Sequence, residues 1–161
     1  MQKKGLSVEI PGRETITVRQ ALCDVNGTLG LDGTLSDAVK ERLRRLQALI
    51  PVYLVTADTH GTADNLVQEC GQLEIARIKP GKEAEQKVEL LKNLGAWQTI
   101  AFGNGANDAL MLRNACVGIC IMNGEGTAVQ AMMASDILVR SAEEALDLLL
   151  QPARLIATLR C

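Results

Sequence analysis

The sequence is poor in aromatic residues, with one Trp, one Tyr and one Phe among 161 residues. Since 47% of the residues are apolar, the core must be built from Leu, Ile, Val, Ala and Met. Aromatic side chains on which nucleic-acid bases stack are therefore scarce. Seventeen basic and nineteen acidic residues give a net charge of -2, which offers no electrostatic footprint for a polyanion. We expect no nucleic-acid partner.

Long apolar runs are also missing. The first 18 residues lack the apolar core of a secretory signal, and no segment approaches the roughly 18–20 apolar residues that span a bilayer. The sequence thus predicts no membrane partner and a cytoplasmic location. The length fits a single domain over residues 1–161 that buries roughly two-thirds of the surface of its unfolded form.

The sequence contains a single histidine, His60. Its cysteines are odd in number and scattered along the chain: Cys23, Cys70, Cys116, Cys120 and Cys161. Cys116 and Cys120 are expected on one face of one strand because their spacing is even. A zinc site would need two further ligands, and His60 lies far off in sequence. Buried, reduced thiols are favoured over a disulfide framework.

Strand-like and helix-like segments alternate along the chain. LSVEI and TITV, separated by the turn signal PGRE, predict an N-terminal hairpin within residues 1–18, followed by a core over 19–161. Apolar runs then alternate with amphipathic segments at 36–49, 61–70, 83–94, 106–114, 126–134 and 141–150. Runs buried on both faces that alternate with helices indicate a parallel sheet covered on both sides. The predicted architecture is three-layered α/β.

Polar residues follow the apolar runs, where loops gather at the carboxyl edge of such a sheet. Asp24 and Asn26 follow the first central run, and Thr56 and Asp58 follow the second. A lysine-rich segment, residues 79–87, follows the third, and Asn104, Asn107 and Asp108 follow the fourth. Acid, hydroxyl and cation together are the parts of a phosphate site.

Asp24 is a candidate nucleophile, because an ionised carboxylate can attack phosphorus, or a ligand of Mg²⁺ together with Asp108. Alternatively, Asp24 only bonds nearby amides at a strand end, and Asp108 only complements a helix dipole. Backbone amides in the turn at Gly27 and Thr28 are suited to phosphoryl oxygens. Thr56 could donate a hydroxyl or simply cap the next turn.

A lysine near the site would balance the phosphoryl charge. Lys79, Lys82, Lys87 and Lys92 are available, and most surface lysines are merely solvated. Lys87 falls about one turn into a predicted helix and beside its apolar face, whereas Lys92 lies further from any strand end. We prefer Lys87.

These motifs resemble the haloacid dehalogenase superfamily and, within it, the phosphorylation domain of P-type cation pumps. "DVNGTLGLDG" is similar to the pump motif DKTGTLT, "TADTHGTADNL" to TGDNKGTA, and "EQKVELLKNLG" to xDKVxxVxxL. "GNGANDALML" is similar to GDGxNDAPAL, and residues 117–139 to IGIAMGxGTxVAKxAADxVL. The resemblance implies a Rossmann-like fold. Only residues 25–55 separate Asp24 from Thr56, which leaves no room for a cap domain or a nucleotide-binding domain.

The resemblance also implies roles for individual residues. Asp24 would accept the phosphoryl group, and Asn107 would support the part of the site that binds Mg²⁺. The phosphate-binding set would comprise Gly27, Thr28, Thr56, Ala57 and Lys87, with Thr56 and Lys87 also serving catalysis. Lys87 is preferred because the apolar residues that follow it fit the pump pattern, whereas those after Lys82 do not. The Mg²⁺ set would comprise Asp24, the backbone carbonyl of Asn26, Asn104 and Asp108.

Two departures from the family pattern lower the expected activity. Asn26 stands where superfamily phosphatases use an acid/base Asp, and that assistance is typically worth about 10²–10⁴ in rate. Asn104 replaces the first Asp of GDGxND, which removes a negative charge from the metal site. We expect a slow Mg²⁺-dependent phosphohydrolase acting on a phosphorylated small molecule or macromolecule. The alternative is a phosphate-binding or regulatory module without turnover. Without a cap, a neighbouring subunit could cover the site in a homo-oligomer, with the hairpin as a possible edge for assembly.

Overall fold

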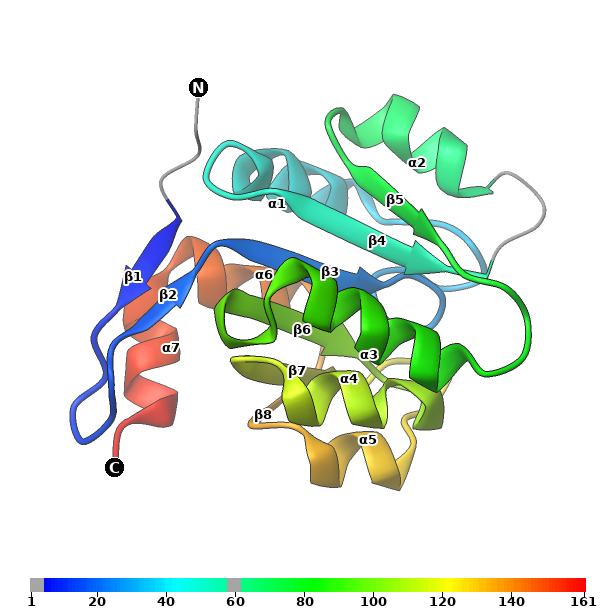
Figure 1. The fold of residues 1–161 in the computed structure, drawn as a ribbon. Coiled ribbons are helices and arrows are strands. Elements are labelled where there is room, and N and C mark those ends of the chain that lie inside the picture. The colour runs from blue at the N-terminus through cyan, green and yellow to red at the C-terminus, as the bar shows by residue number, and fades with distance from the viewer. Residues whose placement is uncertain (1–4, 58–61) are drawn as a thin grey trace.

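A computed structural model describes residues 5–57 and 62–161 of the chain. Its centre is a six-stranded sheet in the order β5-β4-β3-β6-β7-β8, in which every neighbouring pair is parallel (Figure 1). The strands are β3 (Gln20–Asp24), β4 (Val52–Thr56), β5 (Glu74–Arg77), β6 (Thr99–Gly103), β7 (Val117–Ile121) and β8 (Ile137–Val139). The predicted parallel α/β sheet is therefore confirmed.

Helices cover both faces of this sheet and follow the strands in alternation. They are α1 (Asp37–Gln47), α2 (Thr62–Cys70), α3 (Glu83–Leu94), α4 (Ala109–Asn114), α5 (Val129–Ala134), α6 (Ala142–Leu150) and α7 (Pro152–Leu159). Two short 3-10 turns, η1 (Ala96–Gln98) and η2 (Ala106–Asp108), precede β6 and α4. The predicted segment 106–114 is thus divided between η2 and α4, and the helix expected from 126 begins at Val129.

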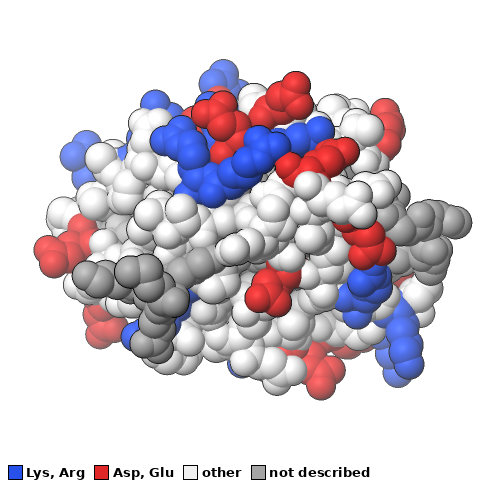
Figure 2. All heavy atoms as spheres, turned by 90° about the horizontal axis from the view of Figure 1, so that it is seen from above, with Lys and Arg blue, Asp and Glu red and all other residues white. Residues whose placement is uncertain are grey.

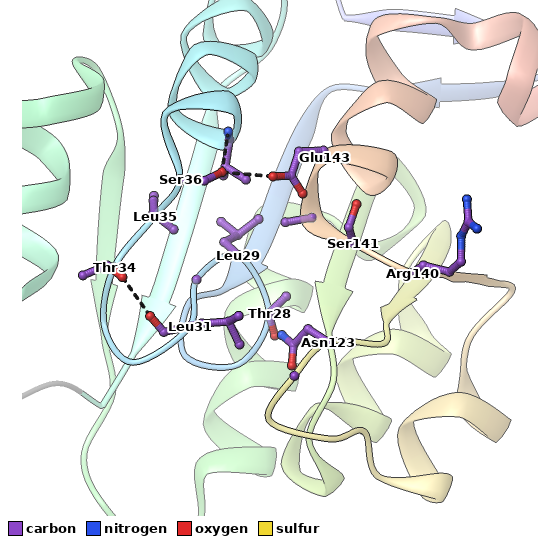
Figure 3. A pocket seen from close by; sticks show the side chains of 14 residues that line it. Thr28, Leu29, Leu31, Thr34, Leu35, Ser36, Asn123, Arg140, Ser141 and Glu143 are labelled. Carbon is purple, nitrogen blue, oxygen red and sulfur yellow. Dashed lines mark hydrogen bonds between the residues drawn. The ribbon is translucent and has the colours of Figure 1, made fainter.

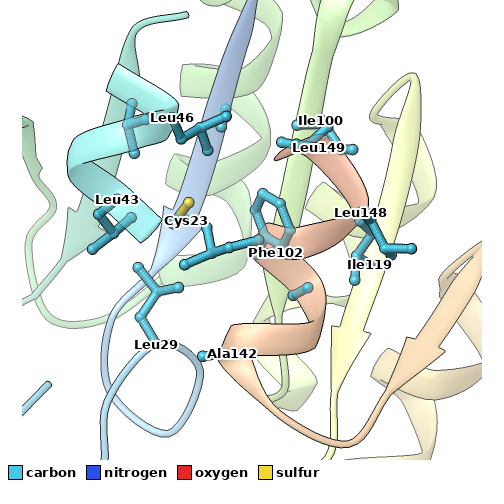
Figure 4. Packing of buried hydrophobic residues seen from close by; sticks show 14 of the residues in the cluster. Cys23, Leu29, Leu43, Leu46, Ile100, Phe102, Ile119, Ala142, Leu148 and Leu149 are labelled. Atoms are coloured by element: carbon cyan, nitrogen blue, oxygen red, sulfur yellow. The ribbon is translucent and has the colours of Figure 1, made fainter. Parts of the chain in front are cut away.

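Two apolar clusters fill the space between the sheet and its helices. Along β6, Ile100 and Phe102 point into one cluster with α1, α2, α6 and α7, whereas Ala101 points into the other with α3, α4 and α5. Figure 4 shows Phe102 packed among aliphatic side chains of the first cluster. With so few aromatic residues in the chain, aliphatic side chains supply nearly all of this packing.

The sequence pattern of α1 explains how such a helix forms. Ser36 caps its first turn by accepting a hydrogen bond from the Val39 N–H at 3.2 Å. Val39, Leu43 and Leu46 recur at helical spacing and are buried against the sheet. The loop and helix between β3 and β4 contain no inserted domain.

The predicted hairpin is present as β1 (Leu6–Val8) and β2 (Ile16–Val18), an antiparallel pair separate from the central sheet. Figure 1 shows it beside α7 and beyond the amino ends of the central strands. The Cys161 N–H donates to the Pro11 carbonyl at 3.4 Å. Helix α7 was not expected from the sequence, although Pro152 at its first turn is a recognised start signal.

The cysteines are all free thiols, as predicted, but the expected placement of Cys116 is wrong. Cys23, Cys70 and Cys120 are buried, whereas Cys161 is exposed at the chain end. Cys116 is only half-buried and precedes β7, so it does not share a strand with Cys120.

The surface mixes charges of both signs. Figure 2 shows acidic and basic side chains side by side on the face that carries α1 and α2, and ion pairs link Lys40 to Glu69 and Arg77 to Asp64. Among the helices described, none combines the length and apolar character needed to cross a membrane.

Packing of α1 on the sheet predicts a large effect of truncation. Leu43→Ala removes a fully buried side chain and should lower the free energy of unfolding by about 2–5 kcal/mol, measured by urea denaturation. Leu49→Ala is the matched control because Leu49 is 39% exposed, and its effect should be clearly smaller. Leu49 lies in the turn just after α1, so equal losses in the two variants would contradict the burial of Leu43 against the sheet.

Candidate active site

The predicted site residues meet at the carboxyl edge of the sheet. Asp24 is the last residue of β3, Thr56 ends β4, and Asn104 directly follows β6. The strand order reverses direction at β3, and ligands of such sheets bind at this switch point. A cavity of about 320 Å³ lies here and is lined by Asp24, Asn26, Thr56, Ala57, Ile78, Glu83, Lys87, Asn104, Gly105, Asn107 and Asp108.

A buried ammonium joins two of the three acidic residues that line the cavity, Asp24 and Asp108. Lys87 Nζ lies 2.9 Å from Asp24 Oδ1 and 2.7 Å from Asp108 Oδ1, and it also donates to Asn107 Oδ1 at 3.1 Å. Three acceptors match the three protons of the ammonium. Lys87 is 3% exposed, whereas Lys79, Lys82 and Lys92 are exposed and do not line the cavity.

Asp108 is fully buried and is held in place from two sides. Its Oδ2 accepts the backbone N–H groups of Asn104 at 3.0 Å and Gly105 at 2.9 Å, while Oδ1 faces Lys87. A Cβ at Gly103 would lie 2.5 Å from the Cβ of Asp108. The glycine before Asn104 is therefore required for Asp108 to reach its position.

Thr28 connects Asp24 to Asn104. Its Oγ1 lies 2.9 Å from Asp24 Oδ2 and 2.9 Å from Asn104 Oδ1. A hydroxyl carries one proton and cannot donate to both oxygens at once. Two oxygens thus compete for one proton, unless a cation or a further proton is bound between them.

Burial raises the pKa of Asp24 from its ordinary value of 3.8 to about 6, with repulsion from Asp108 adding to the effect. The Lys87 ammonium and the Thr28 hydroxyl act in the opposite direction and do not cancel it. Burial by itself would lower the pKa of Lys87, but attraction to Asp24 and Asp108 outweighs it and raises the pKa. The lysine therefore stays charged.

Two residues of the expected phosphate set are placed differently from the prediction. The Gly27 N–H donates to the Gly30 carbonyl at 3.0 Å, and the Thr28 N–H donates to the Val25 carbonyl at 3.2 Å. These amides close the turn itself and do not line the cavity. Because the backbone N–H groups of Gly27 and Thr28 form hydrogen bonds within the turn, Thr28 contacts the site through its side-chain hydroxyl.

The other expected residues line the cavity. Thr56 is buried, and its carbonyl accepts the Ile78 N–H at 3.0 Å, which links β4 to the segment before α3. Ala57 follows it. Asn26 is exposed at the same cavity. Asp58 and His60 lie outside the described residues.

The loop between β7 and α5 contributes contacts that sequence reasoning did not assign. The Asn123 amide donates to the Gly27 carbonyl, and the Asn104 amide donates to the Gly126 carbonyl at 3.1 Å. Sequence reasoning also missed Glu83, which lines the cavity. Its carboxylate accepts a hydrogen bond from the Gly81 N–H, which lowers the pKa of Glu83. The polar residues Asn123 and Glu125 directly after β7 were the available signal.

A second cavity, of about 440 Å³, lies between the β3–α1 loop and the start of α6 (Figure 3). Leu29, Leu31 and Leu35 give it apolar walls, and Ser36 Oγ donates to Glu143 Oε1 at 3.0 Å beside it. Neither Asp24 nor Lys87 lines this cavity. The charged cavity is therefore the candidate active site.

The residues of that site fit a magnesium ion. Mg²⁺ is bound by oxygen ligands, usually one or two carboxylates together with waters. Asp24 and Asp108 supply carboxylates, Asn104 an amide oxygen and Asn26 a carbonyl, and the buried Asp24–Lys87–Asp108 group has a net charge of -1. Within residues 5–57 and 62–161 there is no cluster of three or more His, Cys, Asp or Glu suited to a metal. Waters or substrate oxygens would complete the ligand shell.

Fold and site together define a doubly wound α/β protein with a buried carboxylate–lysine–carboxylate group at the switch point of its sheet. The family description "haloacid dehalogenase-like hydrolase" matches residues 2–115, and the chain belongs to this family.

The chain is also similar in sequence to known proteins and in fold to solved structures. The chain is 41% identical over 92 residues to an uncharacterized protein of Methanocaldococcus jannaschii, covering 55% of this chain and 99% of that protein. It is 30% identical over 136 residues to the copper-exporting P-type ATPase of Staphylococcus epidermidis, covering 83% of this chain but only 16% of the pump.

In structure it is similar to the 3-deoxy-D-manno-octulosonate 8-phosphate phosphatase of Moraxella catarrhalis, solved with magnesium and phosphate. The TM-score is 0.63 at 20% identity, covering 89% of this chain and 94% of that one. The cobalt-bound phosphatase of the same name from Haemophilus influenzae gives a TM-score of 0.67 at 15% identity, with the same coverage.

Removing the charge of Asp24 should stabilise the metal-free protein at alkaline pH. Because the folded state raises the pKa of Asp24, its contribution to stability falls as pH rises from about 4 through 6. In Asp24→Asn, the new amide can donate to Thr28, which frees the Thr28 proton for Asn104. We expect a free energy of unfolding about 1–3 kcal/mol higher than wild type at pH 8, and a smaller difference at pH 5.

Urea denaturation in the presence of a chelator measures this effect. Asp32→Asn removes an exposed charge from the same loop and should change stability by no more than about 0.5 kcal/mol. An Asp24→Asn variant less stable than wild type at pH 8 would show that the ionised carboxylate is needed for folding.

Proposed function

We propose that this protein is a Mg²⁺-dependent phosphohydrolase that forms an aspartyl phosphate on Asp24. The observation that carries the proposal is the buried Lys87 ammonium between Asp24 and Asp108 at the switch point of the sheet. Such a site suits phosphoryl transfer, which depends on positioning and on stabilisation of negative charge. Membership of the hydrolase family and the likeness in fold to phosphatases support it.

The reaction would proceed in two displacements at phosphorus. A carboxylate oxygen of Asp24 forms a bond to phosphorus while the bond to the leaving-group oxygen breaks, so the leaving group departs with its electron pair and takes up a proton from solvent. Water then attacks the phosphorus of the aspartyl phosphate, loses a proton to solvent, and releases inorganic phosphate and the Asp24 carboxylate.

The surrounding residues would bind and orient the phosphoryl group. Lys87 neutralises charge on its oxygens, and Thr56 and Ala57, at the end of β4, lie at the same cavity and can bind them. Thr28 orients the Asp24 carboxylate through its hydroxyl. Asn107 holds Lys87 in position from the third side.

Asp24, Asp108, Asn104 and the carbonyl of Asn26 would hold Mg²⁺. The cation supplies charge stabilisation for the phosphoryl oxygens when it is bound. The solved phosphatases of similar fold contain magnesium or cobalt, which supports a divalent cation. The substrate would be a phosphorylated small molecule or macromolecule.

Asn26 would make turnover slow. An amide cannot protonate a leaving group or take a proton from water at neutral pH, so both steps depend on solvent. Substrates with good leaving groups should therefore react best, and the phosphoenzyme should be longer-lived than in an enzyme with a carboxylate at this position.

Asp24→Asn should abolish the reaction. We expect wild type to hydrolyse p-nitrophenyl phosphate with Mg²⁺ and to carry a phosphoryl adduct after acid quenching, detected by intact mass. Asp24→Asn should show neither above the buffer blank, because its amide is not a nucleophile. Asp32→Asn should retain both. Full activity of Asp24→Asn would refute the proposal.

Asn26→Asp tests the reason for slow turnover. A carboxylate at this exposed position should speed hydrolysis of the phosphoenzyme by about 10–100-fold, near the lower end of acid/base contributions. Single-turnover decay of the adduct measures the rate, and Asn65→Asp on α2 is the control for added charge. If wild type binds Mg²⁺ and beryllium fluoride, an aspartyl phosphate mimic, and neither protein turns over, the site is a binding module.

A further inference from the structure

Glu125, in the loop between β7 and α5, lies beside the metal end of the proposed site. Its Oε1 accepts the Asp32 N–H at 3.0 Å, which ties this loop to the turn after Asp24. On its other side the loop bonds to Asn104, whose amide donates to Gly126 at 3.1 Å and whose carbonyl accepts the Ala128 N–H at 2.9 Å.

The second oxygen of Glu125 approaches the Asn104 side chain. A Cβ built on Gly27 would lie 2.7 Å from Glu125 Oε2 and 2.8 Å from Asn104 Nδ2. Carboxylate and amide therefore border the same small gap. Gly27 keeps this gap open, and its φ of +72° is a conformation that other residues rarely adopt.

We propose that Glu125 supplies, from a neighbouring loop, the negative charge that Asn104 does not carry, and so strengthens Mg²⁺ binding. The inference rests on the proposed function and adds a residue to it. Neither the family resemblance nor the cavity at Asp24 points to Glu125, which does not line that cavity.

Glu125 would act through the electric field and intervening water. No three acidic side chains among the described residues are close enough to ligate one ion, so direct coordination together with Asp24 and Asp108 is not part of the proposal. A unit charge roughly 6–12 Å from a divalent cation, at the dielectric constant of about 80 that suits an exposed side chain, should change the affinity for the cation by about 3–10-fold. Because Glu125 is exposed, salt should reduce the effect.

Two variants separate charge from loop anchoring. Glu125→Gln keeps an oxygen that can accept the Asp32 N–H but removes the charge, whereas Glu125→Ala removes both. Glu14→Gln is the control for the loss of one negative charge, since Glu14 is exposed in the hairpin connection at the opposite end of the sheet.

The affinity for Mg²⁺ would be measured by calorimetric titration and by the shift of Tm with Mg²⁺, which need no turnover. We expect Glu125→Gln and Glu125→Ala to weaken binding alike, by about 3–10-fold in 50 mM salt and less in 500 mM salt. Glu14→Gln should bind as wild type does. Asn104→Asp combined with Glu125→Gln should restore affinity to within about twofold of wild type.

The outcomes distinguish the inference from the proposed function. If wild type binds Mg²⁺ and Glu125→Gln binds it equally well, the inference is wrong, and weakening in Glu125→Ala alone would assign Glu125 to loop anchoring only. If wild type shows no Mg²⁺ binding by either method, the proposed function fails and the inference fails with it.

Discussion

The contact on which the site depends is the buried ion pair of Lys87 with Asp24 and Asp108. Two carboxylates cannot both stay ionised in a buried position without a nearby cation. The Lys87 ammonium, held by three oxygens, provides that charge, yet it leaves the group with one excess negative charge. Burial, together with repulsion from Asp108, therefore keeps the pKa of Asp24 raised despite this ammonium. A divalent cation and a phosphoryl group are ligands whose charges fit this charged group.

The sheet brings these charges together because it is parallel and doubly wound. β3 and β6 are neighbours, so Asp24 and the segment 104–108 lie at one edge, and α3 places Lys87 over them. Close approach there depends on Gly103, which has no room for a side chain against Asp108. The fold thereby holds like charges close together at the site. Removing the charge of Asp24 should therefore raise the free energy of unfolding while abolishing the proposed activity.

Two asparagines shape what the site can do. Asn26 lines the cavity as a neutral group, and Asn104 shares the Thr28 hydroxyl with Asp24. In the proposed function the first slows release of the phosphoryl group and the second weakens the hold on Mg²⁺. The loop at 123–126 is the part of the structure that could offset the second effect, since it contacts both Gly27 and Asn104.

The sequence by itself determined the alternation of strands and helices, the parallel sheet and the set of polar residues at its edge. These follow from local periodicity and from the rule that the carboxyl ends of parallel strands lie at one edge of the sheet, and the structure agrees. Lys87 could be preferred to Lys82 because the spacing of the apolar residues after it fits the pump pattern, and the structure places Lys87 in the cavity.

Tertiary structure alone decided the rest. The amides of Gly27 and Thr28 bond within their own turn, Cys116 precedes its strand, and α7 packs beside the hairpin, none of which local pattern reveals. Glu125 lies more than ninety residues from Gly27 and Asp32 along the chain, as the separation of 93 residues in its bond to Asp32 shows. Periodicity describes only near neighbours, so a contact between two such distant loops exists only once the sheet has brought their strands together.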